Sequence, residues 1–207
     1  MFESWHDRWQ TGRTGWHEPE GNASLRRYWP FTGRRVLVPL CGKSVDLLWL
    51  EAKGNSVVGV ELSVIAVEAF FEENALEFSY TAGILDRYAA TDRDITIYCG
   101  DYFELTDEIC DAHFDRGAFI AVDPDLRERY AAHTNDLLSP DASQLVITVE
   151  YDEAVATGPP HSVDKSEVER LWPGIDCIED REDIHNAPPK FLEVGLESMR
   201  EVTWRSR

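Results

Sequence analysis

The stretch RVLVPLCGKSVDLLWLEAKGNSVVGVELS, Arg35 to Ser63, contains two short apolar runs separated by a helical pattern. The runs are Val36 to Val38 and Val57 to Val60, each rich in the β-branched residues that strands favour. The stretch from Lys43 to Gly54 repeats apolar residues at helical spacing and ends on a glycine stop signal. A strand, a crossover helix and a second strand predict a parallel βαβ unit.

Gly42 and Glu61 occupy the two positions where such a unit binds a ligand. In doubly wound α/β proteins the ligand sits outside the carboxyl ends of the strands, where the first turn opens a helix and the second strand ends in an acid. Gly42 lets the backbone approach a ligand closely. Glu61 can accept hydrogen bonds from both hydroxyls of a ribose, so a nucleoside-containing cofactor is the predicted occupant.

The turn itself argues against two common nucleotide sites. A dinucleotide fingerprint needs three glycines to admit a pyrophosphate, and VPLCGKS supplies only Gly42. A phosphate-binding loop ending in GKS also needs a glycine five positions before Gly42, where Leu37 stands. The cofactor is therefore predicted to be a nucleoside without a pyrophosphate.

The same alternation of strands and helices continues along the chain and predicts one α/β domain with a mostly parallel sheet. Strands are expected over Arg35–Leu40, Ser56–Glu61, Asp94–Cys99, His113–Phe119 and Ser143–Tyr151, with an antiparallel edge hairpin over Gly174–Asp180 and Met199–Arg205. Further helices are expected over 63–76, with Ser63 as the cap, over 124–139 and over Asp164–Leu171.

The charge and the cysteine and histidine content of the chain limit the kinds of partner and cofactor that it is expected to bind. The 207 residues carry a formal charge of -19, which disfavours a phosphate backbone or an anionic membrane as a partner. The four cysteines show no metal or disulfide spacing, and the six histidines show no metal-ligand spacing, so no metal is expected. The N-terminus does not have the pattern of a signal peptide, and we expect a cytoplasmic monomer.

Several motifs together resemble the thiopurine S-methyltransferases, a branch of the class I methyltransferases that use S-adenosylmethionine. They are WHDRWQTGRTGWHE, RVLVPLCGKSVDLLWL, VVGVELS, FDRGAFIAVDP, RERYAAH and GPPHSV, in this order along nearly the whole chain. The resemblance implies a doubly wound, Rossmann-like fold with a mostly parallel seven-stranded sheet and an antiparallel edge hairpin. It implies a single domain over residues 1–207, with residues 1–34 as an N-terminal cap segment.

The resemblance also implies which residues contact the cofactor. Trp9 corresponds to an aromatic lid, Leu40 to a contact in the first turn, and Glu61 to the acid that binds the ribose. Asp101 and Tyr102 correspond to adenine contacts. Two structural alternatives stay open: Trp9 could be a core aromatic of the cap segment, and Glu61 could cap the helix that follows it.

On the substrate side, the resemblance implies that Arg116 lies beside the methionine moiety and the substrate, that Trp16 lines the pocket, and that Lys190 stands near the substrate. Arg116 could instead pair with a neighbouring aspartate, and Lys190 could be a solvated lysine. One departure from the family is Asp123, where relatives usually have an uncharged residue. It adds negative charge near a pocket meant for thiolates.

The predicted activity is methyl transfer from S-adenosylmethionine to the sulfur of a small aromatic or heterocyclic thiol, with S-adenosylhomocysteine as the product. One alternative is another soft nucleophile, such as a halide, thiocyanate, or a selenium or tellurium species. A second alternative is a non-catalytic protein that only binds S-adenosylmethionine. A thiolate attacking in line needs orientation more than acid or base assistance. Because an anionic substrate in a chain of charge -19 must meet a local positive group, Arg116 is the predicted catalytic residue, with Lys190 as the second candidate.

Overall fold

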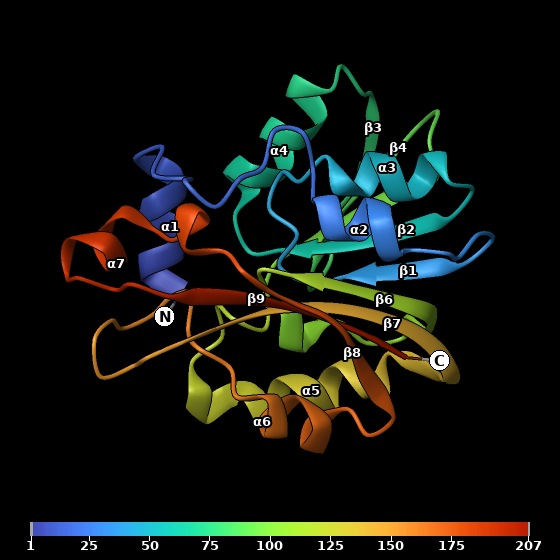
Figure 1. Cartoon of the computed structure of the whole chain (residues 1–207). Helices are drawn as coiled ribbons and strands as arrows, with labels where there is room; N and C mark the ends of the chain where they lie inside the picture. The colour runs from blue at the N-terminus through green and yellow to red at the C-terminus, as the bar shows by residue number, and fades with distance from the viewer. Residues whose placement is uncertain (1, 207) are drawn as a thin grey trace. The chain divides into compact units, whose positions relative to one another are not determined.

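The computed structural model describes residues 2–206, which form two compact units (Figure 1). The first unit holds the chain up to residue 114 together with residues 137–142, and the second holds residues 115–136 and the chain from residue 143. The prediction that the chain is a single domain stays a prediction. None of the helices among the described residues is long and apolar enough to cross a membrane.

The first unit is built on parallel strands. In sheet order its strands are β3 (Phe78–Thr81), β4 (Asp86–Ala90), β5 (Ile95–Cys99), β2 (Ser56–Glu61), β1 (Arg35–Val38) and β6 (Cys110–Arg116), whose last two residues belong to the second unit. β5, β2, β1 and β6 run parallel to one another, whereas β4 pairs antiparallel with both β3 and β5. The βαβ unit expected from the first stretch is therefore confirmed.

The helices of the first unit lie before β1 and between its first strands in the chain. They are α1 (Phe2–Gln10), α2 (Ala23–Tyr28), α3 (Asp46–Ala52) and α4 (Val64–Glu73). Both α3 and α4 pack on β2 and β5, and α1 lies beside α4. Residues Val57 to Glu61 of β2 are all buried, as in a parallel strand that is covered on both faces.

Three details of the first unit differ from the sequence-based expectation. β1 ends at Val38, before the predicted Leu40, because Leu40 takes a φ of 46°, which no strand residue has. The described chain has nine strands where seven were implied, and β3 and β4 are the pair that had not been expected. Ser63 occupies the N-cap of α4, but its side chain makes no capping hydrogen bond.

The second unit contains an antiparallel set of strands in the order β7 (Leu138–Tyr151), whose residues 138–142 belong to the first unit, β9 (Met199–Ser206) and β8 (Ile175–Glu182). The predicted antiparallel edge pair is confirmed, with β8 outermost. The helices of this unit are α5 (Arg127–Asp136), α6 (Lys165–Leu171) and α7 (Pro189–Glu193). β6 ends at Arg116, before the predicted Phe119, because Gly117 takes a φ of 96° and turns the chain.

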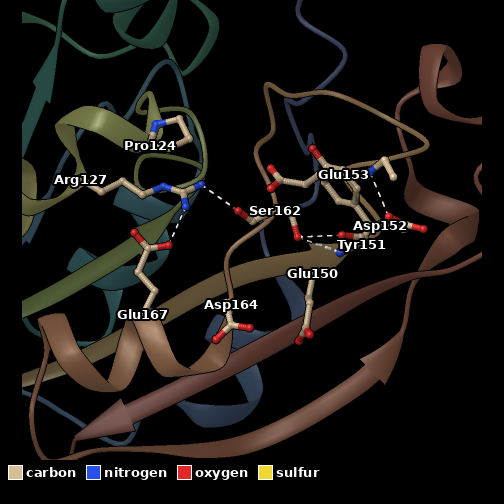
Figure 2. A pocket seen from close by; sticks show the side chains of 10 residues that line it. Pro124, Arg127, Glu150, Tyr151, Asp152, Glu153, Ser162, Asp164 and Glu167 are labelled. Carbon is tan, nitrogen blue, oxygen red and sulfur yellow. Dashed lines mark hydrogen bonds and ion pairs between the residues drawn. The ribbon is translucent and has the colours of Figure 1, made fainter.

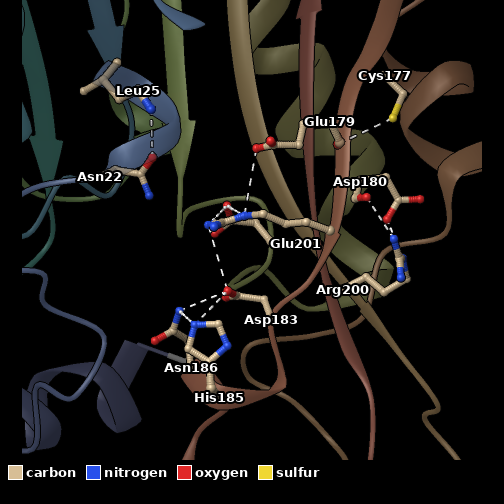
Figure 3. A network of polar contacts seen from close by, with 11 residues as sticks. Asn22, Leu25, Cys177, Glu179, Asp180, Asp183, His185, Asn186, Arg200 and Glu201 are labelled. Carbon is tan, nitrogen blue, oxygen red and sulfur yellow. Dashed lines mark hydrogen bonds and ion pairs between the residues drawn. The ribbon is translucent and has the colours of Figure 1, made fainter. Parts of the chain in front are cut away.

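Charged side chains on β8 and β9 form ion pairs with one another, in which arginines neutralise part of the negative charge of the chain. Arg181 Nη2 lies 2.7 Å from Glu201 Oε1 and 3.9 Å from Asp183 Oδ1. Figure 3 shows Asp183 facing Asn186, whose Nδ2 donates to Asp183 Oδ1 at 3.0 Å. Arg200 contacts Asp180 on the same hairpin. These contacts are structural, because each charge already has a partner of opposite sign or a hydrogen bond.

Candidate functional site

Glu61 ends β2 with its carboxylate held by two main-chain donors. The N–H of Gly42 donates to Oε2 at 2.9 Å, and the N–H of Ser63 donates to Oε1 at 2.8 Å. The side chain is buried, with 7% of the residue exposed. Each carboxylate oxygen can accept more than one hydrogen bond, so both keep acceptor capacity for a ribose hydroxyl. The same carboxylate contacts the start of α4, since Ser63 is the N-cap residue of that helix.

The electrostatics of Glu61 suit a ligand that brings hydrogen-bond donors. Burial raises the pKa of the Glu61 carboxyl, and the N–H groups of Ser63, Gly42 and Leu62 oppose that rise. Two further donors from a ribose would favour the ionised form in the same way as these N–H groups do. The residues present therefore fit the nucleoside that the sequence predicts.

The turn after β1 has an unusual backbone at two positions. Leu40 takes a φ of 46° and Gly42 a φ of 56°, both in the left-handed region. Leucine rarely adopts this region, and holding it there costs on the order of 1 kcal/mol or more. Such strain collects at ligand sites, where the surrounding structure fixes the turn in one shape. The turn places the Gly42 N–H on Glu61 rather than in a strand ladder.

Trp9 on α1 packs against the same turn. A Cβ added to Gly42 would lie 3.2 Å from Trp9 Cζ2, so the glycine is what lets the indole approach the backbone. Trp9 is buried and makes an edge-to-face contact with Trp16, with ring centroids 5.7 Å apart. Trp16 makes a second edge contact with Trp5 at 5.1 Å. The three indoles thus form one aromatic cluster, and its member Trp9 covers the Gly42 turn.

Asp101 and Tyr102 follow β5 at the same edge of the sheet. Cys99 is the parallel register partner of Glu61, and the Gly100 N–H donates to the Glu61 carbonyl oxygen at 2.9 Å. Asp101 Oδ1 accepts the Phe103 N–H at 3.0 Å, and Tyr102 is buried. The first unit therefore brings together Trp9, Leu40, Gly42, Glu61, Asp101 and Tyr102 around the carboxyl ends of β1, β2 and β5.

Two cysteines lie at this edge and are poor nucleophiles. Burial raises the pKa of the Cys41 thiol well above its usual value, and the charge of Glu61 adds to the rise. Burial likewise raises the pKa of Cys99 to about 11. Because the thiolate and not the thiol is the reactive form, neither side chain competes as a methyl acceptor near neutral pH.

Arg116 and Lys190 belong to the second unit. Arg116 ends β6 and is half-buried. The residue before it, Asp115, is buried, and its carboxylate accepts the Tyr130 hydroxyl at 2.6 Å and the Phe119 N–H at 3.1 Å. Burial raises the pKa of Asp115 to about 6. Lys190 is exposed, with Nζ donating to the Thr157 carbonyl oxygen at 3.1 Å.

A pocket of about 460 Å³ lies in the second unit beside the end of β7 (Figure 2). Five carboxylates line it: Glu150, Asp152, Glu153, Asp164 and Glu167. The one guanidinium in the lining, that of Arg127, donates to Glu167 at 2.7 Å and to the Ser162 carbonyl oxygen at 2.9 Å. A pocket of this charge does not favour an anionic thiol.

Sequence reasoning missed how the cap segment is fastened to the first turn. Asp46, at the start of α3, is buried and its Oδ1 accepts the Asn22 N–H at 2.7 Å. Its Oδ2 accepts the Ser44 hydroxyl at 3.0 Å. Ser44 and Asp46 are close enough in the sequence for their local hydrogen bond to have been noticed, whereas the partner Asn22 lies too far along the chain to be found from the sequence.

Comparison with known proteins identifies the family of the chain. The family model for thiopurine S-methyltransferase matches residues 2–207. The thiopurine S-methyltransferase of Bordetella petrii is 42% identical, with 98% of this chain and 96% of that protein covered. A probable thiopurine S-methyltransferase of Yarrowia lipolytica is 43% identical, with 97% of each chain covered.

Solved structures share the fold at low sequence identity. The chain matches 1,6-didemethyltoxoflavin-N1-methyltransferase of Burkholderia thailandensis, solved with S-adenosylhomocysteine, at a TM-score of 0.65 and 17% identity, over 99% of this chain and 86% of that chain. The fold is that of the class I methyltransferases, with parallel central strands and antiparallel edge strands. By its sequence over nearly the whole length, the chain belongs to the thiopurine S-methyltransferase family of S-adenosylmethionine-dependent methyltransferases.

Proposed function

We propose that this protein transfers a methyl group from S-adenosylmethionine to the sulfur of a small aromatic or heterocyclic thiol, as a cytoplasmic monomer. The observation that carries the proposal is the Glu61 carboxylate, aligned by the N–H groups of Gly42 and Ser63 at the end of β2. Sequence identities above 40% to curated family members support the same activity.

The residues of the first unit would hold the cofactor. Glu61 would accept the ribose hydroxyls, Asp101 and Tyr102 would contact the adenine, and Leu40 would line the first turn. Trp9 would cover the bound cofactor, which the contact of its indole with the Gly42 turn supports. When bound, the cofactor supplies a sulfonium that activates its own methyl group.

The remaining residues would act on the acceptor. The acceptor thiolate would supply the electron pair of the new bond and take the methyl group of S-adenosylmethionine, with S-adenosylhomocysteine leaving as the neutral product. In a chain of charge -19, an anionic acceptor must meet a local positive group. Arg116 would supply that charge and Lys190 would support it, while Trp16 would line the pocket for an aromatic ring.

The test is a panel of nucleophiles incubated with S-adenosylmethionine that carries a deuterated methyl group. The proposal expects a labelled methyl thioether from an aromatic thiol, with one S-adenosylhomocysteine formed per product. Labelled methyl iodide, methyl thiocyanate, or a methylated selenium or tellurium compound in its place would favour the alternative acceptor. Cofactor binding without any methylated product would identify a non-catalytic binding protein.

A further inference from the structure

Two side chains that the proposed function does not use, His161 and Asp123, face each other in the second unit. His161 Nε2 lies 3.5 Å from Asp123 Oδ1. The imidazole side chain is 16% exposed and that of Asp123 is 53% exposed. Nε2 is buried and has no hydrogen-bond partner among residues 2–206. The arrangement places the nitrogen at ion-pair distance from a carboxylate.

His161 is held in a firmly anchored segment. Its own N–H donates to the Ile120 carbonyl oxygen at 2.6 Å. A Cβ added to Gly158 would clash with His161 Nδ1, so the ring packs directly on that glycine. The next residue, Ser162, is fixed through its carbonyl oxygen by Arg127 (Figure 2). The imidazole therefore has little freedom to turn away from Asp123.

Asp123 is the last residue of the loop 117–123, which follows Arg116 at the end of β6. Within this loop the N–H groups of Ala121 and Val122 both donate to the Ala118 carbonyl oxygen, at 2.9 and 3.1 Å. At its end the Leu126 N–H donates to the Asp123 carbonyl oxygen at 2.8 Å. The Phe119 N–H of the same loop donates to Asp115 Oδ1 at 3.1 Å, which ties the loop to the residue before Arg116. A contact at Asp123 therefore acts on a loop that is hydrogen-bonded next to Arg116.

Charged groups from several elements determine when His161 is protonated. Burial and the cations Arg127 and Lys190 lower the pKa of His161, whereas Asp123 and Glu153 raise it, and the net shift is downward. Near neutral pH the ring is therefore neutral and the Asp123 charge is not offset by it. As the pH falls through the pKa of His161, the imidazolium forms and pairs with Asp123.

We propose that His161 and Asp123 are a proton-linked positioning pair: protonation of His161 offsets the Asp123 charge, draws the loop behind Arg116 against the His161 segment, and favours an anionic thiol. This step rests on the proposed function, in which Arg116 meets the thiolate. It gives Asp123 a specific role in substrate choice.

The pair itself is tested by histidine NMR titration of the full chain loaded with S-adenosylhomocysteine, with the His161 signal assigned from His161→Gln. Asp123→Asn should lower the pKa of His161 by roughly 0.2 to 0.7 unit, the range for a partly exposed ion pair. Asp125→Asn removes an exposed charge from the same short helix and should leave the pKa of His161 unchanged. Equal pKa values in wild type and Asp123→Asn would overturn the pair.

The positioning role is tested by calorimetric binding of 4-mercaptobenzoate and of thiophenol to the same loaded protein. The ratio of their Kd values cancels the ionisation of the thiol and isolates the response to the extra carboxylate. In wild type the ratio should rise roughly twofold to fivefold as His161 loses its proton. At every pH, the Kd of 4-mercaptobenzoate divided by that of thiophenol should stay low in Asp123→Asn and high in His161→Gln.

A ratio that does not change with pH in wild type, or the same pH dependence in Asp123→Asn, would overturn the positioning role. Failure of either thiol to bind the loaded protein would overturn it as well. The labelled-methyl assay separates this from a failure of the proposed function. Methylated thiol with a pH-independent binding ratio contradicts only the pair, whereas absence of any methylated thiol contradicts the function.

Discussion

The Gly42 N–H donates a 2.9 Å hydrogen bond to Glu61 Oε2, which ties the turn after the first strand to the acid at the end of the second. The bond exists because Leu40 and Gly42 both adopt positive φ and point that N–H toward β2. The carboxylate is thereby oriented before a ligand arrives. Such preorganisation reduces the entropy that binding would otherwise lose.

Replacing Glu61 by glutamine should weaken cofactor binding. The amide keeps the shape and one acceptor but loses the charge, and a hydrogen bond to a charged group contributes on the order of 1.5 to 3 kcal/mol. We expect the Kd for S-adenosylhomocysteine to rise roughly ten- to a hundredfold by isothermal titration. Glu72→Gln, an exposed acid on α4, is the matched control. An unchanged Kd in folded Glu61→Gln would remove this residue from the site.

Adding a methyl group at Gly42 should displace Trp9. The new Cβ would meet the indole at 3.2 Å, and the φ of 56° is also unfavourable for alanine. Gly33→Ala provides the control, because Gly33 has a φ of 66° and nothing within 4 Å of its added Cβ. Only Gly42→Ala should alter the tryptophan emission spectrum and weaken cofactor binding. Equal effects of the two substitutions would mean that the contact between Trp9 and Gly42 does not contribute to cofactor binding.

Asp115 should make stability depend on pH. Its pKa is raised from 3.8 to about 6 in the folded state, so between these values the folded chain binds the proton more tightly than the unfolded chain. The stabilisation of the folded state by this bound proton is fully present below about pH 4 and is lost as the pH rises through about 6. The buried carboxylate should then cost on the order of 2 to 3 kcal/mol at neutral pH.

Asp115→Asn should remove that cost and keep an acceptor for the Phe119 N–H. This cost is measured by urea unfolding at about pH 4.5 and about pH 7.5. From the lower to the higher pH, the free energy of unfolding should fall less in the variant than in wild type. The comparison cancels the repulsion that grows with pH in both proteins. Parallel pH dependence in the two proteins would show that Asp115 titrates near its ordinary value.

The first βαβ unit and Glu61 could be predicted because their signals are local: two β-branched runs, a helical period and an acid at a strand end. β3 could not, since all four of its residues are exposed and no apolar alternation marks it. The φ of Leu40 could not either, because leucine rarely adopts positive φ. Ser63 looks like a helix cap, yet its N–H serves Glu61 and its hydroxyl caps nothing.

Arg116 is expected to stabilise the incoming thiolate. Arg116→Ala should lower kcat/KM for an aromatic thiol roughly ten- to a hundredfold if one charge-assisted contact of about 1.5 to 3 kcal/mol is lost. Arg116→Lys should restore part of it, because lysine keeps the charge without the planar fork. The rising limb of the pH profile should move to higher pH in Arg116→Ala, since the bound thiol then ionises less readily.

Saturating S-adenosylmethionine is needed in this comparison, because a loss of cofactor binding would otherwise pass for a loss of catalysis. Lys190→Ala is measured alongside, because Lys190 is the second positive group proposed for the acceptor and belongs to the same unit. Wild-type turnover with an unshifted pH profile in Arg116→Ala, together with a deficit in Lys190→Ala, would transfer the role to Lys190.

The most direct test of the account is a crystal structure of the protein with S-adenosylhomocysteine. The account predicts both ribose hydroxyls within about 2.5 to 3.0 Å of the Glu61 carboxylate, with the Gly42 and Ser63 N–H bonds retained and the Trp9 indole over the ligand. The adenine should lie beside Asp101 and Tyr102. S-adenosylhomocysteine bound away from the carboxyl ends of β1, β2 and β5, or with its ribose out of reach of Glu61, would contradict it.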